Sequence, residues 1–392
     1  MSVRRHTRGL LRIAGWLLAL VPWAAMACDL EAARPPRSGP CAADAIDNRL
    51  RMNDVQVIGT HNSYKLPLPA DELAAHRKAD RIGAESIDYG HRPLAEQLDA
   101  GLRSFELDVY YDPEGGRYLH PPGAHRRGYP KPPWTTVRLE QMRRSGFKTM
   151  HLSDIDFRSS CVTLRACLTI VHDWSRAHPR HVPILILINA KDGKAGTGAV
   201  QPLPFDAKAF DALDAEIREI LPQRQLIVPD QVQGDFPTLR EAVLANRWPT
   251  LAQARGKIFF ALDEDARKVA LYRGDRRSLE GRAMFVNTEE SSPAAAYLTL
   301  NDPLAQRERI ARAVADGFIV RTRADADTVE ARRNDTRRRE AAFASGAQAV
   351  STDYPQPDTR WGRYQVVFPG QEFVRCNPSR DACRSFSTER VP

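Results

Sequence analysis

The sequence lacks the motifs that mark several large classes of ligand-binding protein. It has neither the G-x-G-x-x-G turn of dinucleotide-binding folds nor the G-x-x-x-x-G-K-[ST] loop of phosphate-binding NTPases. It has no C-x-x-C spacing, so a structural zinc site is not expected. It also has no basic tract with interleaved aromatic residues, so nucleic acid is not an expected partner. Because there is no internal repeat and no long low-complexity linker, we expect one mature domain.

The N-terminal segment is predicted to be removed from this domain. Three arginines precede a mostly apolar run at residues 10–24, a fourth, Arg12, lies near its start, and an Ala-x-Ala pattern follows at 25–27. This order predicts a secretory signal peptide over residues 1–27. The apolar run is shorter than the roughly 20 residues of a membrane-spanning helix, and Ala25 stands where a lipid-modified Cys28 would require leucine. Loss of the segment removes its four arginines and no acid, which lowers the net charge from +8 to +4, so we expect a mildly basic protein that is secreted or periplasmic.

The six cysteines form three pairs that are close in sequence. An even number of cysteines in close pairs indicates disulfides in an exported chain. The predicted disulfides are Cys161–Cys167, Cys376–Cys383 and Cys28–Cys41.

Eight short β-rich runs are separated by helical or loop stretches. Several of them, such as "VPILILI" at residues 182–188, are continuous apolar runs, which are typical of parallel strands buried on both faces. Strands that alternate with helical patterns predict a parallel α/β fold, and eight units over about 300 residues indicate a TIM (β/α)8-type barrel. The predicted strands are Val55–Gly59, Leu102–Val109, Phe147–Leu152, Val182–Ile188, Lys257–Leu262, Ala283–Val286, Gly317–Val320 and Ala347–Ser351.

The predicted barrel spans residues 51–365. A short segment, 28–50, precedes it, and a C-terminal extension at 366–392 is expected to be closed by a disulfide loop. A doubly wound open sheet is the alternative fold. It is disfavoured because such a sheet would need a Gly-rich phosphate turn after an early strand.

Polar residues follow the predicted strands at their carboxyl ends. A single polar residue there is ordinarily a loop residue facing water, but in a TIM barrel all these ends converge on the face that carries the active site. The set therefore predicts one site built from several strands. Its members are His61, Asn62, Glu106, Asp108, His151, Asn189, Lys191, Arg321 and Arg323.

Glu106 and Asp108 are two residues apart on one predicted strand, so their side chains lie on the same face. Together with Asn62 they form an all-oxygen ligand set, which suits a hard cation. We expect one Ca²⁺ ion, with Mg²⁺ as the alternative. The competing interpretation is a solvated acidic strand end, which the apolar neighbours in "SFELDVYY" disfavour.

His61 and His151 are a natural acid/base couple beside a metal, and His120 is a rival for the second position. The cationic side chains Lys191, Arg321 and Arg323, listed with the strand ends above, suit a phosphate group. These parts together predict metal-assisted cleavage of a phosphodiester.

The segments "IGTHNSYK", "FELDVYYDPEGGRY", "FKTMHLSDIDFRSS", "PILILINAKD" and "SGAQAVSTDYP" resemble the secreted bacterial, calcium-dependent branch of phosphatidylinositol-specific phospholipase C. The resemblance covers roughly residues 50–365 and implies a TIM barrel. It implies that His61 and His151 are catalytic and that Asn62 and the Glu-x-Asp pair bind calcium. It also implies that an inositol hydroxyl attacks phosphorus, which gives a cyclic phosphate and diacylglycerol.

The sequence departs from this family near the end of the fourth strand, where the family usually has a glutamate and this chain has Asn189. An amide oxygen still binds calcium, but it brings no charge and cannot act as a base. The departure implies weaker metal binding or greater reliance on His61 as the base. Lys191 matches the basic residue that follows this strand in the family.

Two other functions remain as alternatives. One is a phosphodiesterase acting on glycerophosphodiesters or another phospholipid, although the first strand of the glycerophosphodiesterases typically ends in His-Arg rather than in "THNS". The other is a non-catalytic barrel that binds lipid head groups, which is disfavoured because both histidines and both carboxylates are present. The expected partner is a phospholipid or other phosphodiester, with peripheral contact to a membrane surface, and the expected state is a monomer.

Overall fold

A computed structural model describes residues 28–125, 133–196 and 198–384. The predicted signal peptide, residues 1–27, lies outside the described residues. Within the described ranges, no helix combines the length and the apolar character needed to cross a membrane.

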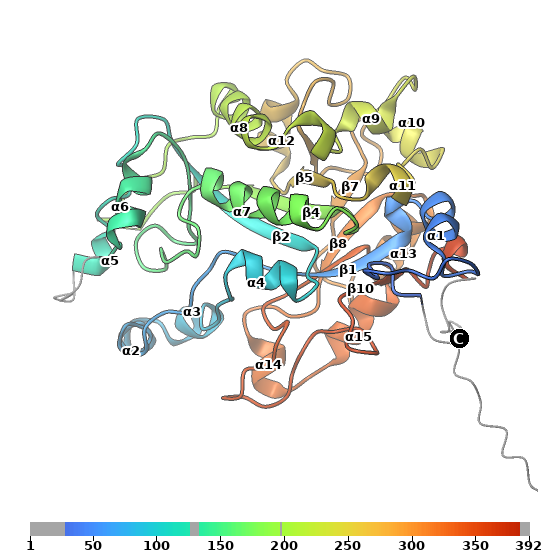
Figure 1. The fold of residues 1–392 in the computed structure, drawn as a ribbon. Helices are drawn as coiled ribbons and strands as arrows, with labels where there is room; N and C mark the ends of the chain where they lie inside the picture. The colour runs from blue at the N-terminus through green and yellow to red at the C-terminus, as the bar shows by residue number, and fades with distance from the viewer. Residues whose placement is uncertain (1–27, 126–132, 197, 385–392) are drawn as a thin grey trace, which may run out of the picture.

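Eight parallel strands form a nearly closed barrel, with helices around it (Figure 1). Neighbouring strands follow the order β6-β5-β4-β2-β1-β9-β8-β7, and a parallel bridge between Asn287 and Tyr297 brings the two ends of this order together. The strands are β1 (Val55–Thr60), β2 (Ser104–Asp112), β4 (Ile184–Ala190), β5 (Ile258–Leu262), β6 (Met284–Val286), β7 (Tyr297–Thr299), β8 (Ile319–Arg323) and β9 (Ala349–Thr352). The predicted TIM-type barrel is confirmed.

Two strand assignments differ from the prediction. The run predicted at Phe147–Leu152 forms β3 (Gly146–Thr149), which pairs antiparallel with β2 and lies outside the barrel. The eighth strand of the barrel is instead β7, which pairs with β8 and is not among the predicted strands. The β7 strand has only three residues, and no helical pattern separates it from β6, so sequence periodicity gives it no distinct signal.

The two longest helices around the barrel are amphipathic. In α7 (Leu164–Ala177), the buried residues Leu164, Cys167, Leu168 and Val171 recur at helical spacing on one face. The helix begins at an N-cap, Thr163, whose hydroxyl accepts the N–H of Ala166. The other helices are α1 (Ala43–Arg49), α2 (Ala70–Ala79), α3 (Arg81–Ser86), α4 (Leu94–Asp99), α5 (Pro122–His125), α6 (Thr136–Arg143), α8 (Ala207–Ile220), α9 (Pro229–Gln233), α10 (Leu239–Leu244), α11 (Leu251–Ala254), α12 (Ala266–Arg273), α13 (Arg307–Ala315), α14 (Val329–Arg333) and α15 (Arg337–Ala344).

The segments that flank the barrel cover the amino ends of its strands. Glu31 forms an ion pair with Arg103 at the start of β2, with Nη2 and Oε2 2.7 Å apart, and accepts the N–H of Val182 just before β4. The strand β10 (Val374–Cys376) pairs antiparallel with β1. All three predicted disulfides are present, Cys28–Cys41, Cys161–Cys167 and Cys376–Cys383. These flanking segments leave the carboxyl ends of the strands, where the polar residues gather, accessible for the predicted site.

A close approach of β1 and β2 brings two parts of the predicted site together. Gly59 faces Ser104 in the register, and a Cβ atom at position 59 would lie 2.0 Å from the Ser104 carbonyl oxygen. At the carboxyl end of this pair, Ser63 donates its N–H to the Glu106 carbonyl oxygen and its Oγ accepts the Glu106 N–H at 2.8 Å. The chain after β1 is therefore fixed beside the carboxylates of β2.

Candidate active site

The first predicted histidine lies directly after β1 and is held by a carboxylate from β9. Its Nδ1 is 2.9 Å from Oδ1 of Asp353, the residue that follows β9. Since a carboxylate can only accept, Nδ1 carries the proton and Nε2 of His61 keeps its lone pair. That Nε2 is 3.6 Å from Oε1 of Glu106, so it faces the carboxylates of β2.

The surroundings of His61 favour its neutral form. Burial, and then the Arg323 guanidinium, lower the pKa of His61 well below its usual value. The Tyr89 hydroxyl lies 3.1 Å from Nδ1, and the Tyr89 and His61 rings stack with centroids 5.8 Å apart. A neutral imidazole whose lone pair faces the site is able to accept a proton.

The second predicted histidine has the same kind of partner. Nδ1 of His151 lies 2.8 Å from Oδ2 of Asp156, which leaves Nε2 of His151 for the site. Burial alone would raise the pKa of Asp156, but Lys65 and His151 outweigh burial and lower it. Because His151 affects the pKa of His61, the two rings lie within electrostatic reach of each other. The rival residue, His120, is exposed on the loop after β2.

His151 reaches the site by a different route from the predicted one. It follows the antiparallel β3, so it does not stand at the end of a barrel strand. The Tyr110 hydroxyl, from β2, donates to the His151 carbonyl oxygen at 2.9 Å and fixes this loop against the barrel.

Glu106 and Asp108 are brought together with Asn189, as the sequence predicts. Asp108 faces Asn189 in the register of β2 and β4. The Asn189 Nδ2 donates to Oε1 of Glu106 at 2.8 Å and to Oδ1 of Asp108 at 3.1 Å. Both carboxylates are buried, so their charges need compensation.

Two cations from the predicted set provide this compensation. Arg321 on β8 donates from Nη2 to Oε2 of Glu106 at 2.6 Å, and its side chain is only 2% exposed. The Lys191 Nζ lies 3.1 Å from Oδ2 of Asp108, and its side chain is 32% exposed. Burial alone would lower the pKa of Lys191, but the Asp108 carboxylate outweighs burial and raises it. Lys191 can therefore reach a ligand at the rim, whereas Arg321 is engaged within the barrel.

Arg323 lies beside His61 and links two acidic residues. Its Nε donates to the Asp325 carbonyl oxygen at 3.0 Å, and its Nη2 donates to Oδ2 of Asp353 at 3.2 Å. The same Nη2 is 3.4 Å from Nδ1 of His61. Its side chain is partly exposed, so a phosphate at the rim lies within its range.

Asn62 joins the carboxylates through a tyrosine. It adopts the left-handed conformation, with φ of 47°, which asparagine tolerates better than most residues. Its Nδ2 donates to the Tyr89 hydroxyl at 2.8 Å, and its Oδ1 is 3.4 Å from the Tyr64 hydroxyl. Burial, and then the nearby Asp108 carboxylate, raise the pKa of Tyr64 well above its usual value, so the Asn62 oxygen and the Asp108 carboxylate share one neighbour.

The four residues fit a hard cation by their chemistry. The set holds two carboxylates, which Asn189 bridges through its Nδ2, and the Asn62 amide, whose Oδ1 faces the Tyr64 hydroxyl. Carboxylate and amide oxygens are ligands that a hard cation prefers. Oδ2 of Asp108 is buried and, although Lys191 lies 3.1 Å away as an ion pair, it receives no well-directed hydrogen bond. Among the described residues there is no group of three or more histidines, cysteines and acids placed to hold a metal.

Several residues of the site carry no clear signal in the sequence. Asp353 follows the predicted strand Ala347–Ser351, but the residue pattern gives it no role, and Asp156 lies in a loop five residues after His151. Lys65 is fully buried and donates to the carbonyl oxygens of Ile87 at 3.0 Å and Tyr89 at 2.6 Å. Pairings of this kind depend on the fold rather than on local pattern.

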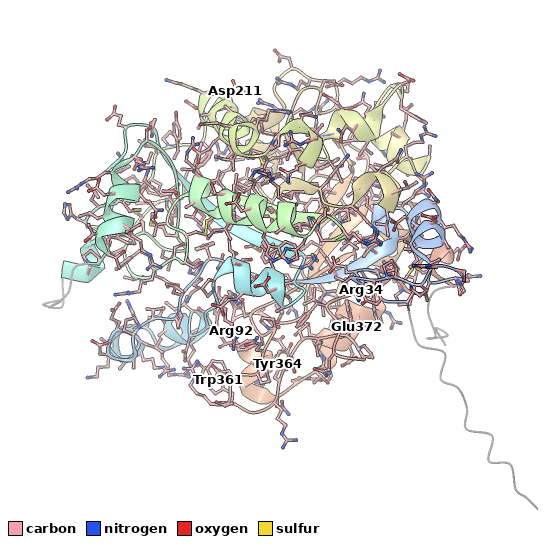
Figure 2. The ribbon with its side chains drawn as sticks, in the orientation of Figure 1. Arg34, Arg92, Asp211, Trp361, Tyr364 and Glu372 are labelled. Atoms are coloured by element: carbon pink, nitrogen blue, oxygen red, sulfur yellow. A yellow bond between two sulfur atoms is a disulfide. The ribbon has the colours of Figure 1, made fainter. Side chains whose placement is uncertain are left out.

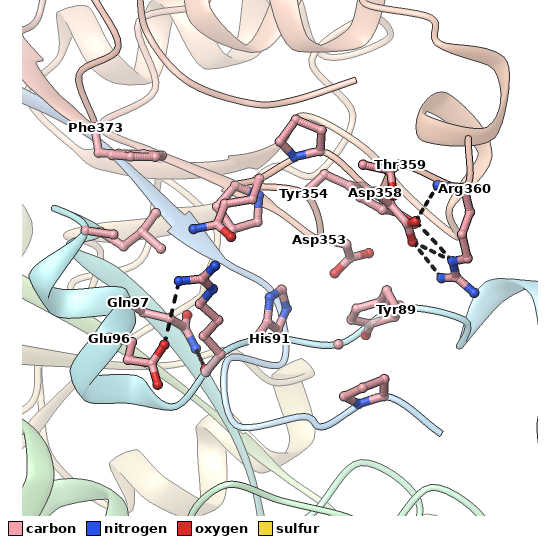
Figure 3. A pocket seen from close by; sticks show the side chains of 18 residues that line it. Tyr89, His91, Glu96, Gln97, Asp353, Tyr354, Asp358, Thr359, Arg360 and Phe373 are labelled. Atoms are coloured by element: carbon pink, nitrogen blue, oxygen red, sulfur yellow. Dashed lines mark hydrogen bonds and ion pairs between the residues drawn. The ribbon is translucent and has the colours of Figure 1, made fainter. Parts of the chain in front are cut away.

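Two cavities adjoin the site. One, of about 350 Å³, lies behind the His61–Asp353 pair, between α4 and the segment after β9, and Figure 3 shows Asp353 between His91 and Tyr89 there. The other, of about 300 Å³, lies beside Lys191 and is lined on its other side by residues 152–155 of the His151 loop. The second cavity adjoins the loop that carries His151, although neither His61 nor His151 is among its lining residues.

Comparison with known proteins bears on the family and the fold of the chain. A family model described as Ca²⁺-dependent phosphoinositide phospholipase C matches residues 50–378. The chain is similar in structure to a calcium-dependent phosphoinositol-specific phospholipase C from a Gram-negative Pseudomonas species, with 16% identity, a TM-score of 0.52, and coverage of 85% of this chain and 97% of that chain. It is also similar to a Ca²⁺-dependent phosphatidylinositol-specific phospholipase C from Streptomyces antibioticus, with 17% identity, a TM-score of 0.50, and coverage of 78% and 95%. No curated protein matches the chain by sequence.

At these identities the structural likeness bears on the fold alone, whereas the family model bears on descent and covers most of the chain. The resemblance seen in the sequence is confirmed. The chain belongs to the Ca²⁺-dependent phosphoinositide phospholipase C family and is a phosphoric diester hydrolase.

Proposed function

We propose that the protein is an exported, calcium-dependent enzyme that cleaves the head-group phosphodiester of a phospholipid, with phosphatidylinositol as the expected substrate. The observation that carries this proposal is the pair of carboxylate-bound histidines, His61 with Asp353 and His151 with Asp156, beside the carboxylates of β2. Each histidine keeps its Nε2 for the reacting groups. A non-catalytic barrel would have no need of two such pairs.

His61 is the proposed base and His151 the proposed acid. Nε2 of His61 takes the proton from the inositol hydroxyl, whose oxygen then bonds to phosphorus. The bond from phosphorus to the glycerol oxygen breaks, and Nε2 of His151 gives its proton to that oxygen. The products are a cyclic phosphate and diacylglycerol. Asp353 and Asp156 hold the two rings in the tautomer and orientation that these transfers need.

Asn62, Glu106, Asp108 and Asn189 are the proposed ligands of calcium, which when bound supplies positive charge for the phosphate. Lys191 and Arg323 are the proposed contacts to the phosphate oxygens, because both are partly exposed at the rim. Arg321 is proposed to position Glu106 rather than to contact the phosphate, since its guanidinium already binds the Glu106 carboxylate.

Contact with a membrane surface is part of the proposal. Four of the exposed large apolar side chains lie on segments that follow the carboxyl ends of β1, β2, β7 and β8, the same face as the site. They are Ile82, Val137, Leu304 and Val329, with exposed fractions of 74%, 69%, 59% and 40%. Exposed apolar side chains around a site suit a lipid surface. Export as a monomer is proposed with it, and the three disulfides support export.

The test is a release assay on vesicles of phosphatidylinositol or phosphatidylcholine, and on soluble glycerophosphoinositol, each with calcium or with a chelator. We expect cleavage of phosphatidylinositol that depends on calcium and is lost in His61→Ala. The matched control is His178→Ala, an exposed histidine after α7 at the opposite end of the barrel. Cleavage of glycerophosphoinositol alone would favour the glycerophosphodiester alternative, and no cleavage of any substrate would exclude the enzyme proposal.

A further inference from the structure

A second buried carboxyl group, Asp325, stands behind the His61–Asp353 pair and has no role in the reaction proposed above. It follows β8 and has no exposed surface. Its Oδ1 accepts the backbone N–H of Asp353 at 2.8 Å. Its Oδ2 accepts the Thr352 hydroxyl and lies 3.2 Å from the Tyr364 hydroxyl. Asp325 therefore holds the end of β9 in the position from which Asp353 reaches His61.

Figure 2 shows Tyr364 beside Trp361, on the segment that follows β9. Both rings pack edge-on against Tyr354, with centroids 5.8 and 5.7 Å away. The Tyr364 hydroxyl also lies 3.0 Å from the Ala324 carbonyl oxygen. When Oδ2 of Asp325 carries a proton, the Tyr364 hydroxyl can therefore donate to the Ala324 carbonyl oxygen instead.

Two buried carboxyl groups, Asp325 and Asp353, lie near one cation, Arg323. Arg323 donates to the Asp353 carboxylate, but it meets Asp325 only at the backbone carbonyl oxygen. Within the part of the chain that the structure describes, the side chain of Asp325 accepts hydrogen bonds from neutral donors only, two hydroxyls and one N–H. Two carboxylates buried around one guanidinium cannot both be charged at low cost, so the negative charge favours Asp353.

The titration behaviour agrees with this geometry. Burial, and then the negative charge of Asp353, raise the pKa of Asp325 to about 7. The charged and titratable groups that face it are Asp353, Arg323, Tyr354 and Tyr364. Arg323 is therefore the single cation among these facing groups.

We propose that Asp325 is a positioning residue of the active site, a protonated acid that anchors Asp353 and leaves the negative charge on the carboxylate that orients His61. Above neutral pH, Asp325 ionises and a second negative charge appears behind the pair. The effect of Asp325 on catalysis rests on the function proposed above, whereas the protonation of Asp325 in the folded chain does not. The two are tested separately.

The first test measures thermal unfolding midpoints at pH 5 and pH 8 for the wild type and Asp325→Asn, which has the same shape but never ionises. The folded chain binds the proton more tightly than the unfolded chain, so the wild type loses stability as pH rises from about 4 to 7. We expect the midpoint of Asp325→Asn, relative to wild type, to be higher at pH 8 than at pH 5. Asp327→Asn, the same change at an exposed site two residues away, should give a constant difference.

An Asp325→Asn difference that is constant or that falls with pH would show that Asp325 is ionised in the folded chain and would overturn the proposal. If Asp325→Asn does not fold, Tyr364→Phe replaces it. Loss of that hydroxyl removes a donor to the carboxylate and raises the folded-state pKa further, so the loss of stability should continue to a higher pH than in the wild type. An unchanged pH dependence in Tyr364→Phe would equally overturn the proposal.

The second test measures kcat and KM on phosphatidylinositol from pH 5.5 to 8.5. Asp325→Ala should lower kcat with little change in KM, because the anchor of Asp353 is lost while the rim is intact. Asp325→Asn should keep most of the activity at pH 6 and lack one ionisation near neutral pH that the wild type shows. A wild-type kcat in Asp325→Ala would exclude the positioning role. A wild type that cleaves nothing would overturn the proposed function and leave the stability test decisive for the protonation of Asp325.

Discussion

The Nδ1 of His61 and the Oδ1 of Asp353 are 2.9 Å apart, although 292 positions separate the two residues in the chain. The contact follows from the barrel register, in which Thr60 at the end of β1 faces Thr352 at the end of β9. The residues that come next on each strand are therefore neighbours at the rim. The geometry fixes the imidazole with its lone pair on Nε2, toward the carboxylates of β2.

The variant Asp353→Asn tests whether catalysis depends on the tautomer of His61. The Asn amide offers an N–H to Nδ1, which favours the wrong tautomer and places the ring proton on Nε2. We expect kcat to fall about 1,000-fold or more with little change in KM. Steady-state kinetics on phosphatidylinositol vesicles would measure it. Asp358→Asn is the control, because Asp358 pairs with Arg360 at the surface, and an equal loss there would contradict the assignment.

Asn189→Glu should strengthen calcium binding. The amide of Asn189 lies between Glu106 and Asp108, so a carboxylate there adds one negative charge to the proposed ligand set. We expect the calcium concentration for half-maximal activity to fall about tenfold. Stabilisation by calcium in thermal unfolding should shift in the same direction. An unchanged calcium requirement, like that of the exposed control Asn48→Glu on α1, would place Asn189 outside the metal site.

Lys65→Met should destabilise the fold and disturb the second histidine. The Lys65 Nζ is 3.3 Å from Oδ2 of Asp156, and both side chains are buried. Removal of the cation leaves an uncompensated carboxylate in the core, for which we expect a loss of about 3–5 kcal/mol in unfolding free energy. Denaturant unfolding measures this loss. Lys78→Met, on the exposed face of α2, should change it by less than about 0.5 kcal/mol.

The sequence was sufficient to predict the barrel and most of its rim. Continuous apolar runs such as β4 identify buried parallel strands, and the polar residues after them mark the carboxyl ends without any knowledge of pairing. It was not sufficient where a partner comes from a distant strand. Asp353 became a partner of His61 only through the register of β1 and β9.

The errors in the strand assignment have a related cause. The residues of β3 are buried, as barrel strands are, but β3 folds back antiparallel on β2. The three residues of β7 are too few to show a period. His151 was nevertheless placed at the site, because the β3 hairpin returns its loop to the same rim.

The buried His181, at the amino end of β4, should make the fold less stable in acid. Its Nδ1 donates to the Val182 carbonyl oxygen at 2.6 Å, and its Nε2 faces the Ser175 hydroxyl at 2.8 Å. Burial lowers its pKa to about 4, so the folded chain holds the neutral ring while the unfolded chain binds a proton below about pH 6.5. The contribution of this residue is therefore complete at pH 7 and is lost as pH falls from about 6.5 to 4.

His181→Asn separates this effect from general acid unfolding, because an Asn amide keeps the donor to Val182 and does not titrate. Unfolding free energies at pH 7 and pH 4 would be measured in denaturant for both chains. Relative to the variant, the wild type should lose up to about 3 kcal/mol between the two pH values. His178→Asn, at an exposed position, should show no such difference. If wild type and His181→Asn lose stability in parallel, His181 is charged in the folded protein and the acid sensitivity arises elsewhere.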